Sequence, residues 1–142
     1  MIQRVQSLYL LLTAIISALL FYVPLFQYPL SATDTAPHMY FVSANAFLLI
    51  LNIVVGALSF ITIFFFKNRK LQLRACRLCL MLIFVMVGLL FYTSDALAGG
   101  IDQRVTFKAG AYLPLIQIVL VFLAHVGIKK DDKLVRSADR LR

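Results

Sequence analysis

Two cysteines three residues apart are the first candidates for chemistry. The stretch Cys76–Cys79, CRLC, has the C-x-x-C spacing that four-span membrane thiol oxidoreductases use with a quinone. The neighbouring Arg74 and Arg77 carry the charge that lowers a thiol pKa. However, the pair follows a basic segment that we place at the cytoplasmic face, where thiols stay reduced, and the sequence has no second cysteine pair. We therefore interpret both cysteines as structural thiols, and a thiol or quinone redox enzyme is the last of three functions that we consider.

The histidines and the acidic residues offer no better site. His38 falls between the first two apolar stretches and His125 near the end of the fourth, so one haem cannot join them across the membrane. Ion-coupled transporters usually carry a carboxylate inside a span. Asp95 lies instead at the end of the third stretch, where we expect it to pair with Arg104 or Lys108. A zinc site at the cysteines would need two more ligands. We predict no catalytic residue, no cofactor and no metal.

Long apolar stretches define the elements that must position these residues. Of the 142 residues, 62% are hydrophobic and 14% charged, which is too apolar for an ordinary soluble domain. A membrane-crossing helix needs about 20 apolar residues to cover roughly 30 Å of hydrocarbon. The sequence therefore predicts an all-α membrane four-helix bundle over residues 1–128, with helices near residues 5–26, 41–66, 76–97 and 110–128. The proline-containing first outer loop is predicted to be irregular, and alternation in residues 101–107 predicts one short strand or hairpin arm.

The placement of the basic residues predicts the orientation. The net charge is +8, and twelve of the fourteen Lys and Arg residues lie at the N-terminus, in the segment 67–77 or after residue 128. With four spans these three segments share one side of the membrane, and the positive-inside rule makes that side the cytoplasm. We therefore expect cytoplasmic N- and C-termini and a lipid bilayer, rather than nucleic acid, as the partner of the positive charge.

Polar residues inside the predicted spans form stripes. In hydrocarbon these groups need partners, and small residues let helix backbones approach closely. We interpret them as a helix-packing seam, which consists of Thr13, Ser17, Asn45, Asn52, Gly56, Ser59 and Gln117. The alternative is a small oligomeric transporter or channel, in which Asn45, Asn52 and Gln117 would line the path.

The last fourteen residues, 129–142, form a short charged cytoplasmic tail in which nine residues are charged. As a helix, the tail would place an apolar stripe among mixed charges, which suits a specific protein surface better than a lipid surface. The alternatives are a solvated, disordered tail and a tail that docks on the basic segment 67–77 of the bundle itself. The residues that we expect to dock a partner are Leu134, Arg136, Ala138, Arg140 and Leu141.

Three stretches of the sequence resemble a known family. They are the opening MIQRVQ followed by YLLL, the segment AYLPL that enters the fourth span, and the ending KKDDKLVRSADRLR. Together they resemble small bacterial four-span inner-membrane proteins that are grouped only as a domain of unknown function. The resemblance implies a bacterial source and four spans, and it supplies no activity. We therefore expect a non-enzymatic accessory or scaffolding subunit that docks other membrane subunits, and a cytoplasmic protein, through the seam and the basic face.

Overall fold

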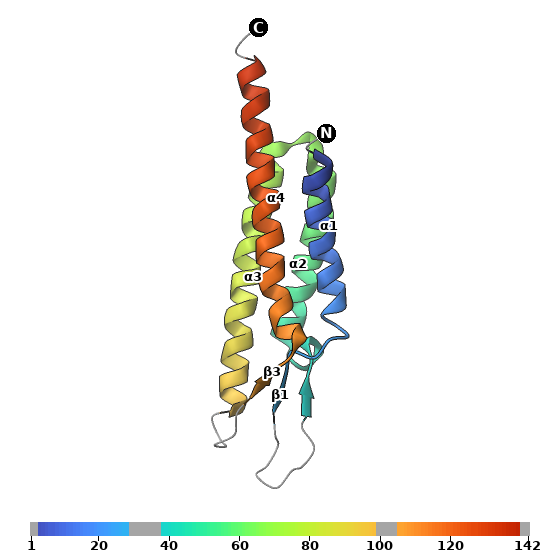
Figure 1. The fold of residues 1–142 in the computed structure, drawn as a ribbon, viewed down its shortest axis with the longest axis vertical. Helices are drawn as coiled ribbons and strands as arrows, with labels where there is room; N and C mark the ends of the chain where they lie inside the picture. Colours follow the sequence, from blue (N-terminus) through green and yellow to red (C-terminus); the bar gives the residue numbers. More distant parts are fainter. Residues whose placement is uncertain (1–2, 29–37, 99–104, 140–142) are drawn as a thin grey trace.

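A computed structural model describes residues 3–28, 38–98 and 105–139. Four helices run along the long axis of the molecule (Figure 1), and they are α1 (Gln3–Leu19), α2 (Ala46–Phe64), α3 (Arg69–Ala98) and α4 (Ala109–Asp139). Three short strands gather at one end: β1 (Phe26–Tyr28), β2 (His38–Tyr40) and β3 (Thr106–Phe107). Two 3-10 helices, η1 (Val42–Ala44) and η2 (Phe65–Lys67), precede and follow α2. The predicted all-α fold with four helices is confirmed.

The helices pack in a ring, because α1 packs against α2 and α4, and α3 packs against the same two. Figure 1 shows the start of α1 and the end of α4 at one end of the bundle and the strands at the other. The segment between α2 and α3, which carries much of the positive charge, lies at the same end as the start of α1. We call this end, with residues 67–77 and 129–139, the basic end.

The distribution of side chains is that of a membrane protein. Three helices, α2, α3 and α4, are long and apolar enough to cross a membrane, and only 28% of each apolar window is buried inside the protein. Large apolar side chains therefore point outward, as Phe47 does with 72% exposure and Met81 with 70%. Polar side chains such as Asn52 and Gln117 are instead completely buried. This distribution is typical of a protein surrounded by hydrocarbon. Apolar side chains can face lipid, whereas polar groups must find their partners inside the protein, because lipid offers them none.

The first predicted span is shorter than expected. Helix α1 ends at Leu19, and its 17 residues cover about 26 Å at 1.5 Å per residue. A proline disfavours helical backbone in the residue before it, so Pro24 keeps the helix from reaching residue 26. The third helix begins earlier than predicted, at Arg69, and the fourth runs without a break past residue 128.

A three-stranded antiparallel sheet has the order β2-β1-β3. It corrects the prediction of an irregular first loop at the two ends of that loop, which form β1 and β2, while residues 29–37 lie outside the described residues. Strand β1 pairs Phe26 with both Tyr40 and Phe107, so the central strand takes one partner from each outer connection. The Phe26 ring is completely buried and stacks on Tyr40 with ring centres 4.5 Å apart. Phe107 also contacts Phe91 of α3, which joins the sheet to the bundle. We call the sheet and these rings the aromatic cap.

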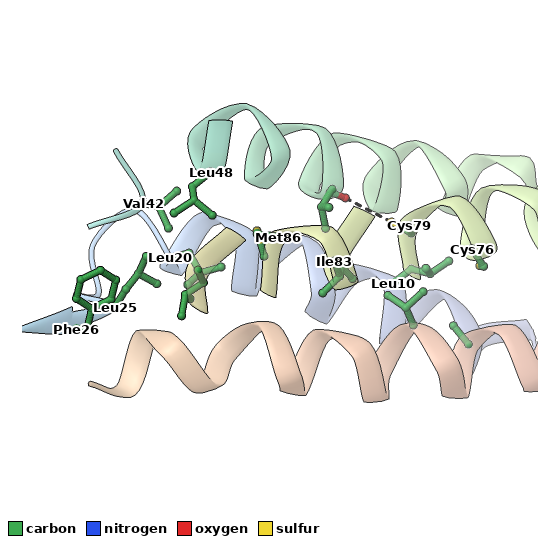
Figure 2. Close-up of a cluster of buried hydrophobic side chains, with 14 of the residues drawn as sticks. Leu10, Leu20, Leu25, Phe26, Val42, Leu48, Cys76, Cys79, Ile83 and Met86 are labelled. Carbon is green, nitrogen blue, oxygen red and sulfur yellow. Dashed lines mark hydrogen bonds between the residues drawn. The ribbon is translucent and has the colours of Figure 1, made fainter. Parts of the chain in front are cut away.

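The apolar core runs from the aromatic cap along the bundle axis (Figure 2). Leu20, Leu25 and Val42 lie next to Phe26 at the cap, and Leu10 and Ile83 continue the core toward the basic end. The side chains come from all four helices and the connections, so the core holds the ring of helices closed.

Candidate functional site

The polar seam centres on Ser17 of α1. Gln117 Nε2 in α4 donates hydrogen bonds to Ser17 Oγ at 2.8 Å and to the Thr13 carbonyl oxygen at 3.2 Å. Asn52 Nδ2 in α2 donates to the Ser17 carbonyl oxygen at 2.9 Å. One turn of α1 is therefore bonded to both of its neighbours in the ring, and all four residues are buried.

Helix α2 meets α1 closely at Gly56. A Cβ atom placed at this glycine would lie 3.0 Å from Ser17 Cβ, which is tighter than ordinary packing. Small residues on facing helices permit such approaches in membranes, where association depends on packing and hydrogen bonds rather than on the hydrophobic effect. The structure thus brings together Thr13, Ser17, Asn52, Gly56 and Gln117.

Ser59 continues the seam toward the basic end, where it meets α3. Its hydroxyl group hydrogen-bonds with the Cys79 sulfur at 3.2 Å (the dashed line in Figure 2), and the Cys79 thiol also reaches the Val55 carbonyl oxygen at 3.8 Å. Sequence reasoning did not place Cys79 in the seam, because nothing in the spacing of α3 indicates which side chain faces Ser59.

Cys76 and Cys79 are both free thiols with at most 1% exposure. Buried thiols of this kind are unreactive, because the thiolate is disfavoured in an apolar interior and no partner can reach it.

Asn45 has a different role from the predicted one. It is the residue before α2, and its side-chain oxygen accepts from the backbone N–H of Phe47 at 2.9 Å and of Leu48 at 3.4 Å. Asparagine is favoured at this position because it satisfies amide groups that the helix leaves unpaired. Burial raises the pKa of Tyr40 above its usual value, a hydrogen bond with Asn45 lowers it in part, and the charge of Tyr28 raises it further. Asn45 therefore belongs to the cap side of the molecule and lies outside the polar seam.

At the basic end, an ion pair holds α3 to α4. Arg69 Nη1 donates to the Asp131 carbonyl oxygen at 3.0 Å, and Arg69 Nη2 lies 3.6 Å from Asp131 Oδ2. Gln6 and Gln72 are buried beside this pair and line a cavity of about 10 Å³ with it, close to the volume that one water needs. The sequence left contact between the tail and the basic segment 67–77 open, but it did not pair Arg69 with Asp131, because the two residues lie 62 positions apart.

The residues predicted to dock a partner fall mostly in the last turns of α4. Leu134 is 51% exposed, Arg136 and Ala138 fall within α4, and Arg140 and Leu141 lie outside the described residues. Helix α4 passes the start of α3, where Asp131 pairs with Arg69, and its last residues, 133–139, continue beyond the ends of the other three helices (Figure 1). We call these residues the α4 extension.

The geometry of the seam is suited to holding the helices together. The amide nitrogens of Asn52 and Gln117 donate to backbone carbonyls and a hydroxyl group of the neighbouring helix. The amide oxygens of the same two side chains are buried and have no hydrogen-bond partner among the described residues. Within residues 3–28, 38–98 and 105–139, no three His, Cys, Asp or Glu side chains gather as a metal site requires. His38 lies in β2 at the aromatic cap, and His125 lies in α4 toward the basic end.

The chain matches a family described as a domain of unknown function (DUF4293) over residues 2–141. No curated protein and no solved structure matches it.

Proposed function

The chain belongs to the DUF4293 family, and we propose that it is a non-enzymatic accessory or scaffolding subunit of a larger assembly in a bacterial inner membrane. In this proposal the four helices span the membrane with both termini in the cytoplasm. The α4 extension binds a cytoplasmic protein, and the outer faces of the helices contact other membrane subunits.

The α4 extension is the observation that carries the proposal. From Asp131, which pairs with Arg69, to Asp139 the helix extends by about 12 Å, at 1.5 Å per residue. Starting a helix is costly, whereas lengthening one adds a hydrogen bond for each residue fixed. The membrane part of α4 therefore supports a charged helical segment that is too short to be stable alone. Arg69 also holds the base of the extension through Asp131. A helix that is ordered and exposed in this way is suited to binding a protein surface.

The seam gives the second reason. Asn52 and Gln117, the residues that would line a path through the bundle, are 0% exposed and donate to the backbone or side chains of α1. Their placement favours a structural role of the bundle interior over conduction through a single chain. Outward-facing side chains such as Phe64 and Phe84 leave broad apolar faces that lipid or another membrane helix can cover.

Orientation is tested by thiol labelling in intact cells. We expect an introduced thiol at Ser43, beside the aromatic cap, to react with a membrane-impermeant reagent, and one at Arg74 to react only after the membrane is opened. Both positions are exposed, and the two native thiols are buried, so background labelling should be low. The reverse pattern would overturn the proposed topology.

The docking role is tested by gentle extraction and quantitative mass spectrometry of the proteins that come with the chain. Leu134→Asp with Leu141→Asp should abolish a specific association, because carboxylates would be buried at the contact. Arg136→Glu with Arg140→Glu should weaken it in a salt-dependent way.

Val135→Asp is a control, because it introduces one carboxylate on a different face of the same turn as Leu134 and should leave the association intact. All variants should reach the membrane in normal amount. If a chain truncated after Lys130 keeps every associated protein and its normal abundance, the extension is not a docking element and the proposal is wrong.

A further inference from the structure

A groove of about 270 Å³ lies between α3 and α4 at the basic end, next to the α4 extension and apart from the polar seam. It is lined by Leu73, Arg77, His125, Lys129 and Asp132. Two basic side chains from two helices therefore face one hollow. With a neutral histidine, Arg77, Lys129 and Asp132 leave one net positive charge there, which matches the single negative charge of a phosphodiester.

The polar groups of the groove offer hydrogen bonds as well as charge. Lys129 follows His125 by four residues on α4, so both side chains lie on one face of that helix. His125 also lines the groove, and because its Nδ1 is buried, a ligand would bond the imidazole through Nε2. Arg77 is exposed on α3 and carries the planar donor group that binds phosphate oxygens in pairs.

The surface next to the groove is apolar on the side of the membrane interior. Met81 follows Arg77 by four residues and is 70% exposed, and Phe122 precedes His125 by three residues and is 55% exposed. A molecule with a phosphate in the groove would therefore have hydrocarbon surface beside it, within about one helical turn. Basic pockets between membrane helices, at the level of the head groups, are suited to anionic phospholipids.

We propose that this groove binds the phosphate of an anionic phospholipid, with Arg77 and Lys129 as its charged ligands and His125 as a hydrogen-bonding partner. The acyl chains lie along Met81 of α3 and Phe122 of α4. The site differs from the general attraction of a basic surface for lipid because it depends on two named cations from two helices.

The experiment titrates the full chain, purified in mild detergent, with phosphatidylglycerol, phosphatidylcholine or inorganic phosphate. Native mass spectrometry counts the bound lipid, and thermal unfolding measures the stabilisation. We expect one retained phosphatidylglycerol and a higher unfolding temperature. Phosphatidylcholine should bind at least tenfold more weakly, because its head group has no net charge. Inorganic phosphate should cause no comparable stabilisation, because it has no acyl chains.

Two double variants with the same loss of charge separate the groove from the rest of the basic end. Arg77→Gln with Lys129→Gln should weaken phosphatidylglycerol binding at least tenfold. Arg74→Gln with Lys130→Gln, which removes exposed cations outside the groove from the same two helices, should change it less than threefold. Arg77→Lys with Lys129→Arg keeps both charges and should retain most of the binding. The unfolding temperature without lipid shows whether each variant is folded.

Three results would overturn the proposal. Equal weakening in the two glutamine double variants would mean that lipid binds the basic end without a site. Equal binding of phosphatidylcholine would mean that the phosphate charge is not recognised. Stabilisation by inorganic phosphate that matches phosphatidylglycerol and is lost in the groove variant would assign the groove to free phosphate rather than lipid.

Discussion

The two ends of the bundle are built in different ways. At the aromatic cap, three strands from two connections pair with one another, and the Phe26 ring is buried against Tyr40 and close to Phe107. At the basic end, the helices stop at different heights, and α4 projects alone (Figure 1). There the helices are joined by a partly exposed ion pair between Arg69 and Asp131, beside a groove that carries charge.

On the proposed function, this difference divides stability and binding between the two ends. Burial of aromatic rings and backbone pairing contribute to stability at the cap. The basic end keeps cations and an exposed helix, which add little stability because surface ion pairs contribute only about 0–1 kcal/mol. We therefore expect changes at the cap to affect unfolding most, and changes at the basic end to affect binding most.

The largest effect on stability is expected at Phe26. Phe26→Ala should lower the free energy of unfolding by about 3–5 kcal/mol, because it leaves a cavity and removes the stacking on Tyr40. Denaturant or thermal unfolding in detergent measures the change. Phe47→Ala, at a ring that is 72% exposed, is the control and should change it by less than about 1 kcal/mol. Equal effects would mean that the cap does not stabilise the bundle.

Gly110 tests how closely α4 meets the cap. A Cβ atom there would lie 2.5 Å from the Pro24 carbonyl oxygen, so the start of α4 must shift. Gly110→Ala should therefore cost about 1–3 kcal/mol of stability. Gly88→Ala is the matched control, because nothing lies within 4 Å of its Cβ position on α3, and it should be neutral or stabilising by about 0.5–1 kcal/mol. A neutral Gly110→Ala variant would contradict the close contact.

Asn52, between the two ends, should give an intermediate effect. Asn52→Leu removes the hydrogen bond to the Ser17 carbonyl oxygen and should weaken helix association by roughly 0.5–2 kcal/mol. Resistance to unfolding in detergent measures it, and Ile53→Ala, at an exposed position one residue along, serves as control. Unchanged resistance would show that this bond is not needed to hold α2 against α1.

The smallest effect is expected at the ion pair of the basic end. A double-mutant cycle with Arg69→Leu and Asp131→Asn should give a coupling energy of about 0.2–1 kcal/mol, because both side chains retain some contact with solvent. Added salt should reduce it. A coupling energy as large as the cost of Phe26→Ala would break the comparison, since the basic end would then stabilise the fold as much as the cap does.

The sequence by itself determined the parts of this protein that depend on composition and on helical spacing. Runs of apolar residues indicated four helices, because hydrocarbon requires long apolar segments whatever packs beside them. The polar stripe predicted that Ser17, Asn52 and Gln117 need partners, because an unpaired polar group is costly in lipid. The structure places these three together, but the choice of Ser17 as the shared partner could not be read from spacing.

Only the tertiary structure decided what joins residues distant in the chain. Phe26 pairs with Phe107, and Arg69 pairs with Asp131. The strand pairing could not be predicted because strands of two or three residues are too short to show a periodic pattern. Local sequence also does not distinguish the role of Asn45 from that of Asn52. Both are asparagines on one predicted stripe, yet the extended backbone of Asn45 makes it a cap, while Asn52 bonds across to α1. Which backbone a residue adopts, and which helix lies opposite it, is set by packing of the whole bundle rather than by local sequence.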